Sequence, residues 1–273
     1  RLGTAPVCMA AQLAGSAHCA ARPVSYATLK QLHPDLWIVD HPFRIGGLNI
    51  GTRTTVVRLE GGLWMHSPGP LTPELKAGLE ALGPMRAIVA PNTMHYYFFE
   101  ENREAFPEAE GWGCEALLRK APRLPIDHIL QADSGFQLES VLVEGVPELA
   151  ETVFYHRPSR TLITTDLVFN MPKSGGGKGI TGWWTRAFMK LNGAYARFGP
   201  SRIFRHLALR DGRALGRSIA KILEWDIQRI IMGHGEVLEK DGHQALCKAF
   251  AWLPGGLPPS AGNLTPQMGD DEG

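Results

Sequence analysis

The feature that most constrains the fold is an alternation of short β-prone segments with helical segments over residues 36–252. Segments rich in β-branched and aromatic residues occur at 36–45, 54–67, 136–146, 151–156 and 161–169. Gly46-Gly47 and Gly61-Gly62 interrupt the first two of them as turns do, which predicts an antiparallel opening meander. Because hairpins dominate, the pattern favours a layered α/β or α+β protein with two mixed sheets covered by helices.

Helical patterns and two further strands complete the alternation. In the segment 73–82, Leu75, Leu79 and Leu82 fall on one helical face, and Thr72 is the expected N-cap. Further helices are predicted at 183–196, 211–224 and 241–252, and short buried strands at 86–92 and 227–235.

Composition excludes several classes of protein. The chain has 273 residues, 44% of them hydrophobic, and a formal charge of +1, which gives no global attraction to nucleic acid or to an anionic membrane. No run approaches ~18 apolar residues, so no bilayer-spanning helix is predicted. The four cysteines are scattered without a C-x-x-C pair, which favours a reducing compartment and a cytoplasmic location.

The two ends differ from the middle. Residues 1–34 lack Asp and Glu and are rich in Ala, Gly and Ser, which predicts a flexible leader. This leader resembles the tail of a transit peptide, and the alternative location is therefore organellar. The Pro/Gly-rich residues 254–273 are predicted to be a disordered tail. A single domain is expected at 35–253.

Two residues carry the strongest chemical signals. His234 lies between two glycines at the end of an apolar strand, where its imidazole is exposed to a loop and suits metal binding or proton transfer. Asp166 lies in the middle of the apolar run TLITTDLVF (161–169), and a carboxylate there is unfavourable unless it is paired or bound to a cation. The alternatives are a surface-turn histidine and a capping aspartate.

The order of these motifs resembles that of the metallo-β-lactamase superfamily. The resemblance rests on PNTMHYYF (91–98), TLITTD (161–166) and GHG (233–235), covers about 36–252, and is strongest to a branch known mainly as a domain of unknown function. It implies an α+β fold, an αββα sandwich of two mixed β-sheets with helices on the outer faces. In this superfamily, loops at one edge of the sandwich hold one or two metal ions.

The resemblance carries over only part of the metal site. Asp166 matches the aspartate that bridges two metal ions, with Thr165 in place of a glycine, and His234 matches the last histidine ligand. The H-x-H-x-D-H signature is absent: a register starting at Asn92 puts Met94, Tyr96 and Tyr97 at the other ligand positions. Val146 stands where the middle histidine is expected.

The remaining ligands suit one metal ion rather than two. A catalytic zinc needs three protein ligands and an open position, and His95, Asp166 and His234 are the candidates, with Asn92 as a weak oxygen donor. One divalent ion, zinc, is expected, with a metal-free site as the alternative. Bound metal would make hydroxide available near neutral pH.

Other polar residues have weaker assignments. Asp166 and His234 would also act in catalysis. Tyr96 or Tyr97 would donate a hydrogen bond to a developing oxyanion. The alternative for both tyrosines is a place in the core, because adjacent aromatic residues after a strand usually pack there. His66 is expected to pack at a strand end rather than bind metal, and His156 to be structural.

Residues 171–225 form a basic, aromatic, helical segment. It holds eleven basic residues against Asp211 and Glu224, a net charge of +9. Such a segment suits an anionic ligand or a membrane surface, or is simply a solvated face. No sequence-specific nucleic acid is expected, and the run SGGGKG (174–179) does not match a phosphate-binding loop.

Two functions remain open. The first is a divergent metallo-β-lactamase-like hydrolase of a small, anionic ester, amide or phosphoester with a single-metal or altered site. The second is a catalytically inactive scaffold of the same fold that binds a ligand, a membrane surface or a partner protein. The sequence does not indicate the oligomeric state.

Overall fold

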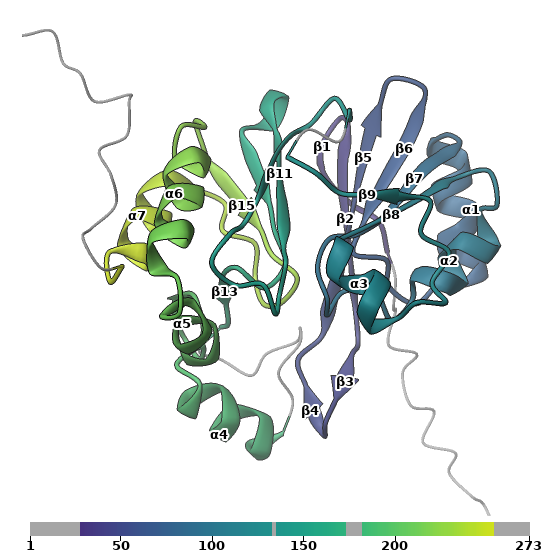
Figure 1. Ribbon diagram of the computed structural model, residues 1–273. Coiled ribbons are helices and arrows are strands. Elements are labelled where there is room, and N and C mark those ends of the chain that lie inside the picture. The colour runs from purple at the N-terminus through teal and green to yellow at the C-terminus, as the bar shows by residue number, and fades with distance from the viewer. Residues whose placement is uncertain (1–27, 133–134, 173–181, 254–273) are drawn as a thin grey trace, which may run out of the picture.

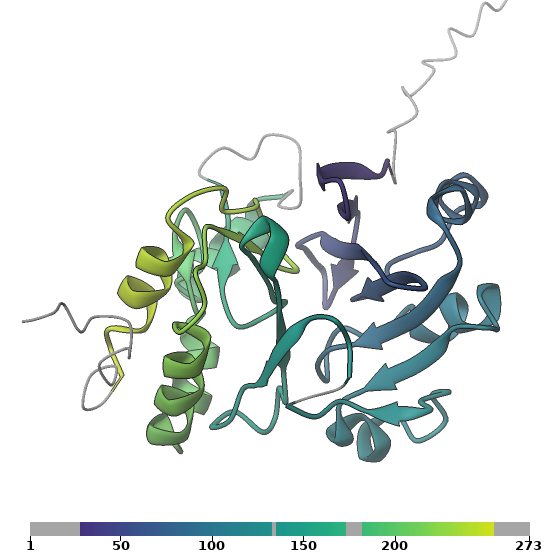
Figure 2. The same cartoon turned by 90° about the horizontal axis from the view of Figure 1, so that it is seen from above.

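The computed structural model describes residues 28–132, 135–172 and 182–253. Two β-sheets pack face to face, and helices cover the outer face of each, so the predicted αββα sandwich is confirmed (Figure 1). Seen from above, α6 (Gly212–Ile222) and α7 (Gly242–Phe250) flank one sheet, and α1 (Pro73–Leu82), drawn in blue, flanks the other (Figure 2). No helix within these three ranges is long and apolar enough to cross a membrane.

The first sheet has seven strands in the order β1-β2-β5-β6-β7-β8-β9. These are β1 (Lys30–His33), β2 (Leu36–His41), β5 (Thr52–Leu59), β6 (Gly62–His66), β7 (Met85–Ala90), β8 (Glu110–Gly113) and β9 (His128–Ile129). Within this sheet, β1, β2, β5 and β6 pair antiparallel, as the predicted opening meander requires. The pairs from β6 through β7 and β8 to β9 are parallel. Helices α1 (Pro73–Leu82), α2 (Phe99–Ala105) and α3 (Glu115–Lys120) belong to this half.

The second sheet has four strands in the order β10-β11-β12-β15. These are β10 (Glu139–Leu142), β11 (Thr152–His156), β12 (Thr161–Ile163) and β15 (Arg229–Ile231), with a 3-10 turn at Arg157–Ser159. Helices α5 (Arg202–Ala208), α6 (Gly212–Ile222) and α7 (Gly242–Phe250) belong to this half. Strand β12 is parallel to β15, so the chain leaves both strands at the same edge of the sheet.

Short elements gather at one end of the sandwich. They are the hairpin β3 (Arg44–Ile45) and β4 (Leu48–Asn49), the pair β13 (Phe169–Asn170) and β14 (Phe198–Gly199), and helix α4 (Trp183–Leu191). Gly46 and Gly47 have φ angles of 53° and 78°, which lets the two-residue turn of the hairpin close. The Asn49 backbone N–H donates to the Thr185 hydroxyl at 3.1 Å and ties the hairpin to α4.

Three buried layers hold the sandwich together. Side chains of both sheets meet in the middle, where Trp64 and Phe154 pack edge to face with ring centroids 4.8 Å apart. One outer layer joins the first sheet to α1, α2 and α3, and the other joins the second sheet to α5, α6 and α7. Each sheet is therefore buried on both faces, which explains its nearly continuous apolar strands.

Several expected boundaries need adjustment. Helix α1 begins after Thr72, whose hydroxyl accepts from the Leu75 N–H at 3.2 Å, as predicted. The helix expected at 183–196 ends at Leu191, because Gly193 has a φ of 68° and breaks it. Residues 30–33, expected in the flexible leader 1–34, form β1 instead. The rest of that leader (1–27) and the tail 254–273 lie outside the described residues.

Candidate metal centre

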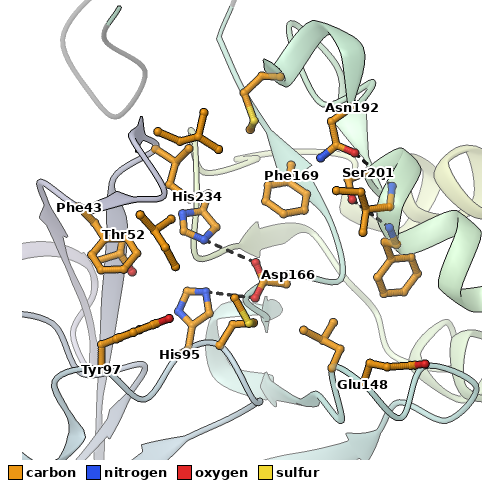
Figure 3. Close-up of a pocket in the computed structure, with 18 of the residues that line it drawn as sticks. Phe43, Thr52, His95, Tyr97, Glu148, Asp166, Phe169, Asn192, Ser201 and His234 are labelled. Atoms are coloured by element: carbon orange, nitrogen blue, oxygen red, sulfur yellow. Dashed lines mark hydrogen bonds and ion pairs between the residues drawn. The ribbon is translucent and has the colours of Figure 1, made fainter. Parts of the chain in front are cut away.

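The three expected ligands converge at one edge of the sandwich. His95 follows β7, Asp166 follows β12 and His234 follows β15. One ligand atom from each lies within 4.8 Å of the other two, and two of the residues are buried and the third half-buried (Figure 3). The parallel pairing of β12 with β15 accounts for this, because it brings residues about seventy positions apart to the same sheet edge.

Asp166 lies between the two imidazoles. Its Oδ2 is 3.3 Å from His95 Nε2, and its Oδ1 is 3.5 Å from His234 Nε2 (Figure 3). The Asn92 side-chain amide donates to Oδ2 at 2.9 Å. Burial alone raises the pKa of Asp166, but the neighbouring His95 and His234 outweigh it and hold that pKa well below its usual range.

Hydrogen bonds on the far side of each ring fix the histidines. His234 Nδ1 is 2.6 Å from the Gly51 carbonyl oxygen, which only accepts, so Nδ1 carries the proton and Nε2 faces Asp166. His95 Nδ1 is 2.7 Å from the Ser67 hydroxyl. Such outer partners orient the metal-binding nitrogen of a histidine. Phe169 stacks on His234, with centroids 5.7 Å apart and planes at 7°.

Glu151 supports the backbone that carries Asp166. It is buried, and its carboxylate accepts from the Thr164 hydroxyl, the Thr165 N–H and the Asp166 N–H. Burial, and then the nearby Asp166 charge, raise the pKa of Glu151. We did not expect this residue from the sequence, because a Glu at the start of a β-prone segment is typical of a surface turn.

Arg53 supports the loop that carries His234. It is buried and donates to the carbonyl oxygens of Met232 at 2.8 Å and Gly235 at 2.7 Å, while Asp40 pairs with it at 2.7 Å. The link spans both sheets, since Arg53 is in β5 and the loop follows β15. Position 233 in this loop requires glycine because of the space it occupies: a Cβ there would lie 2.6 Å from the His95 ring.

Replacing Arg53 with lysine is expected to loosen this loop. An ammonium keeps the charge but lacks the planar fork that reaches two carbonyls and a carboxylate together. We expect Arg53→Lys to lower the free energy of unfolding by about 1–3 kcal/mol, as for the loss of one or two buried hydrogen bonds. Urea denaturation measures this, with the exposed Arg213→Lys as control. Equal stability of the two variants would contradict the role given to Arg53.

An apolar cavity of about 360 Å³ lies over the three ligands. Its lining is mostly aliphatic and aromatic, and includes Phe43, Ile45, Leu48, Met94, Tyr97, Phe98, Val146, Phe169, Phe188, Met189, Ile203 and Leu207 (Figure 3). Tyr96 packs instead against the core of the first sheet, beside Lys120. Tyr97 lines the cavity and Tyr96 does not, so Tyr97 is the better placed of the two to face a ligand, and the catalytic role of Tyr96 stays a prediction.

His66 and His156, the two histidines given packing roles above, are not members of this cluster. His66 is still close enough that the charge of His95, after burial, contributes to lowering its pKa. His66 is buried, stacks on Trp64 with centroids 5.4 Å apart and contacts the edge of Phe154. His156 Nδ1 is 2.6 Å from the Ser159 hydroxyl. Both positions agree with the packing roles expected of them. Ser67, next to His66, was not expected to matter; its φ of 55° is uncommon outside glycine and directs its hydroxyl to His95.

The fold and site together define a class. The described chain has the metallo-β-lactamase fold, and His95, Asp166 and His234 are grouped so that they could hold a metal ion. A family model described as a domain of unknown function, DUF4336, matches residues 34–134. No curated protein matches the sequence.

Solved structures support the fold at low sequence identity. The chain is similar to a metallo-β-lactamase from Pontibacter korlensis, with a TM-score of 0.56 at 12% identity over 82% of this chain and 98% of that chain. It is also similar to the metallo-β-lactamase FIM-1 from Pseudomonas aeruginosa in its mono-zinc form, with a TM-score of 0.52 at 13% identity over 82% and 95%. A metallo-β-lactamase from Hirschia baltica is similar with a TM-score of 0.51 at 13% sequence identity, over 82% of this chain and 98% of that chain.

Proposed function

We propose that this protein is a hydrolase that binds one divalent metal ion, zinc by the chemistry of its ligands, through His95, Asp166 and His234. The substrate is a small molecule with an ester, amide or phosphoester bond. The observation that carries the proposal is the orientation of His234. Because its Nδ1–H is donated to Gly51, the lone pair on Nε2 points at an Asp166 oxygen 3.5 Å away. Two electron pairs face each other there, and a cation between them removes the repulsion.

Charge balance supports a metal ion in that place. Glu151 is buried and Asp166 nearly so, and among the described residues no lysine or arginine forms an ion pair with either. Two buried negative charges are unfavourable without compensation. A divalent ion with two neutral histidines balances them.

The spacing of the ligand atoms also fits zinc. Zn–N and Zn–O bonds of about 2.0–2.1 Å place neighbouring ligand atoms of a tetrahedron roughly 3.3–3.4 Å apart. His95 Nε2 lies 3.3 Å from Asp166 Oδ2 and His234 Nε2 lies 3.5 Å from Asp166 Oδ1, which is close to that spacing, and the three ligand atoms as a set lie within 4.8 Å of one another. When bound, the ion supplies Lewis acidity and a water with a pKa near ~7.

The chain's own residues would orient the substrate and exclude water. Gly51 and Ser67 hold the two imidazoles, and the apolar walls of the cavity surround whatever binds above them. Among the described residues, no Lys or Arg lines this cavity, whereas Glu148 does. The lining therefore favours a substrate with an apolar part over the small anionic molecule expected from the charge of residues 171–225.

A metal-free binding scaffold is the second candidate, and Asn92 favours it. Its amide already donates to Asp166 Oδ2 at 2.9 Å and to the Thr165 hydroxyl at 2.9 Å. A protonated His234 would then satisfy the carboxylate without metal.

Metal analysis separates the two. We expect about one zinc ion per chain after equilibration with zinc and gel filtration, and a higher melting temperature with zinc than with a chelator. Asp166→Asn, which keeps the shape of the side chain, should weaken zinc binding by more than about 100-fold, because even outer partners of a ligand contribute 10–100-fold. Glu148→Gln, in the same cavity, is the matched control and should bind like the parent. Absence of zinc from the parent, with no shift in melting temperature, would favour the scaffold.

A further inference from the structure

Exposed apolar side chains are concentrated in one stretch of the described chain. Nine large hydrophobic residues are exposed in the described part of the chain, and five of them fall within 183–209. These five are Trp183 (77% exposed), Trp184 (56%), Leu191 (72%), Ile203 (54%) and Leu209 (63%). Single exposed apolar residues need no explanation, but two adjacent tryptophans on one short helix are unusual for a surface in water.

The same stretch is basic without any acidic residue. Residues 183–209 contain Arg186, Lys190, Arg197, Arg202 and Arg205, and neither Asp nor Glu. On α4, Thr185 and Met189 are buried, whereas Arg186 and Lys190 are exposed beside the tryptophans. We call the exposed side chains of residues 183–209 the α4–α5 face.

The α4–α5 face adjoins the opening of the cavity. Helix α4 lies beyond the ends of both sheets, next to the β3–β4 hairpin (Figure 1). Met94, Tyr97 and Ile203 line the cavity and are 40%, 50% and 54% exposed, so the cavity reaches the surface where they lie. Because Ile203 belongs both to the face and to the lining, the two apolar surfaces are continuous.

We propose that the α4–α5 face docks on the surface of an anionic lipid bilayer. Tryptophan is favoured at the boundary between headgroups and acyl chains, and each Lys or Arg near an anionic surface adds about 1 kcal/mol. An aromatic and basic surface without acidic residues matches that boundary in both polarity and charge. The net charge of the whole chain, +1, is too small to produce such binding, so the attraction is local to this face.

Docking in this way also defines the substrate class. It would place the apolar cavity opening against the lipid, where the acyl chain of a lipid can enter and bring its ester bond towards His95, Asp166 and His234. This second step rests on the proposed hydrolase function. The docking step does not, because it uses no residue of the metal centre.

Vesicle flotation tests the docking. We expect the protein to float with vesicles of phosphatidylcholine and phosphatidylglycerol, and to bind vesicles of phosphatidylcholine alone weakly. Removing two charges by Arg186→Ala with Lys190→Ala should lower partitioning onto the anionic vesicles by roughly 30-fold. Trp183→Ala with Trp184→Ala should also lower it, and should abolish the quenching of tryptophan fluorescence by brominated lipid.

The control removes the same charge from another face. Arg213 and Lys221 are exposed on α6, and Arg213→Ala with Lys221→Ala should leave binding within about twofold of the parent. Asp166→Asn should float like the parent, so loss of metal and loss of docking are separate outcomes. Equal binding to both kinds of vesicle, an equal effect of the α4 and α6 variants, or self-association through α4 without vesicle binding would each overturn the proposal.

Discussion

Replacing Glu151 with alanine is expected to lower the free energy of unfolding by about 3–5 kcal/mol. The change leaves three buried donors without their acceptor: the Thr164 hydroxyl and the N–H groups of Thr165 and Asp166. An unsatisfied buried donor costs about 1–3 kcal/mol. A loss of this size is a large part of the stability of an ordinary domain, 5–15 kcal/mol.

Two controls make the result specific. Glu148 lies three residues before Glu151, is exposed and pairs with Arg210. Glu148→Ala removes this exposed carboxylate and should change the free energy of unfolding by less than about 1 kcal/mol. Glu151→Gln keeps one acceptor oxygen and should fall between the parent and alanine. Urea denaturation at neutral pH measures all three. A Glu151→Ala protein as stable as Glu148→Ala would show that the hydrogen bonds do not hold the Asp166 backbone.

Acid is expected to destabilise the protein well above the range in which carboxylates protonate. Burial lowers the pKa of His41 to about 4 and that of His66 to about 3, from the usual 6.5. The folded state therefore keeps both rings neutral, whereas the unfolded state protonates them below pH 6.5. Their stabilising contribution is complete above pH 6.5 and is lost as pH falls towards the folded values.

The slope of stability against pH measures this effect. Each of the two histidines should remove about 1.4 kcal/mol per pH unit below pH 6.5, or about 2–3 kcal/mol by pH 4.5. In His66→Phe the aromatic contacts with Trp64 and Phe154 can remain while the titration disappears. Its stability should fall less steeply than the parent's between pH 6.5 and 4.5.

The comparison must be made between variant and parent. The raised pKa of Glu151 acts in the opposite sense, because its contribution is present below its unfolded value and is lost as pH rises. This opposing contribution is common to both proteins and cancels in the difference. Parallel pH profiles for His66→Phe and the parent would contradict the lowered pKa of His66.

The metal centre shows how far local patterns reach. Asp166 was recognisable as a carboxylate inside an apolar run, and His234 as a histidine between two glycines. His95 was a candidate only because of the resemblance, since the usual signature is absent around it. All three lie together in the fold. Their partners Glu151, Arg53 and Ser67 were not predicted, because each makes its contacts with segments far away in the chain.

The sequence by itself determined the alternation of strands and helices, the turns at paired glycines, the capped helix α1 and two of the three ligands. These features depend on hydrophobic period, backbone freedom and side-chain type within a few residues. Only the tertiary structure decided which side chains meet. The parallel pairing of β12 with β15 joins Asp166 to His234, and packing of α4 against the β3–β4 hairpin brings Phe188 and Met189 to the wall of the apolar cavity. Such contacts depend on the order of strands in the sheets, and no local pattern encodes that order.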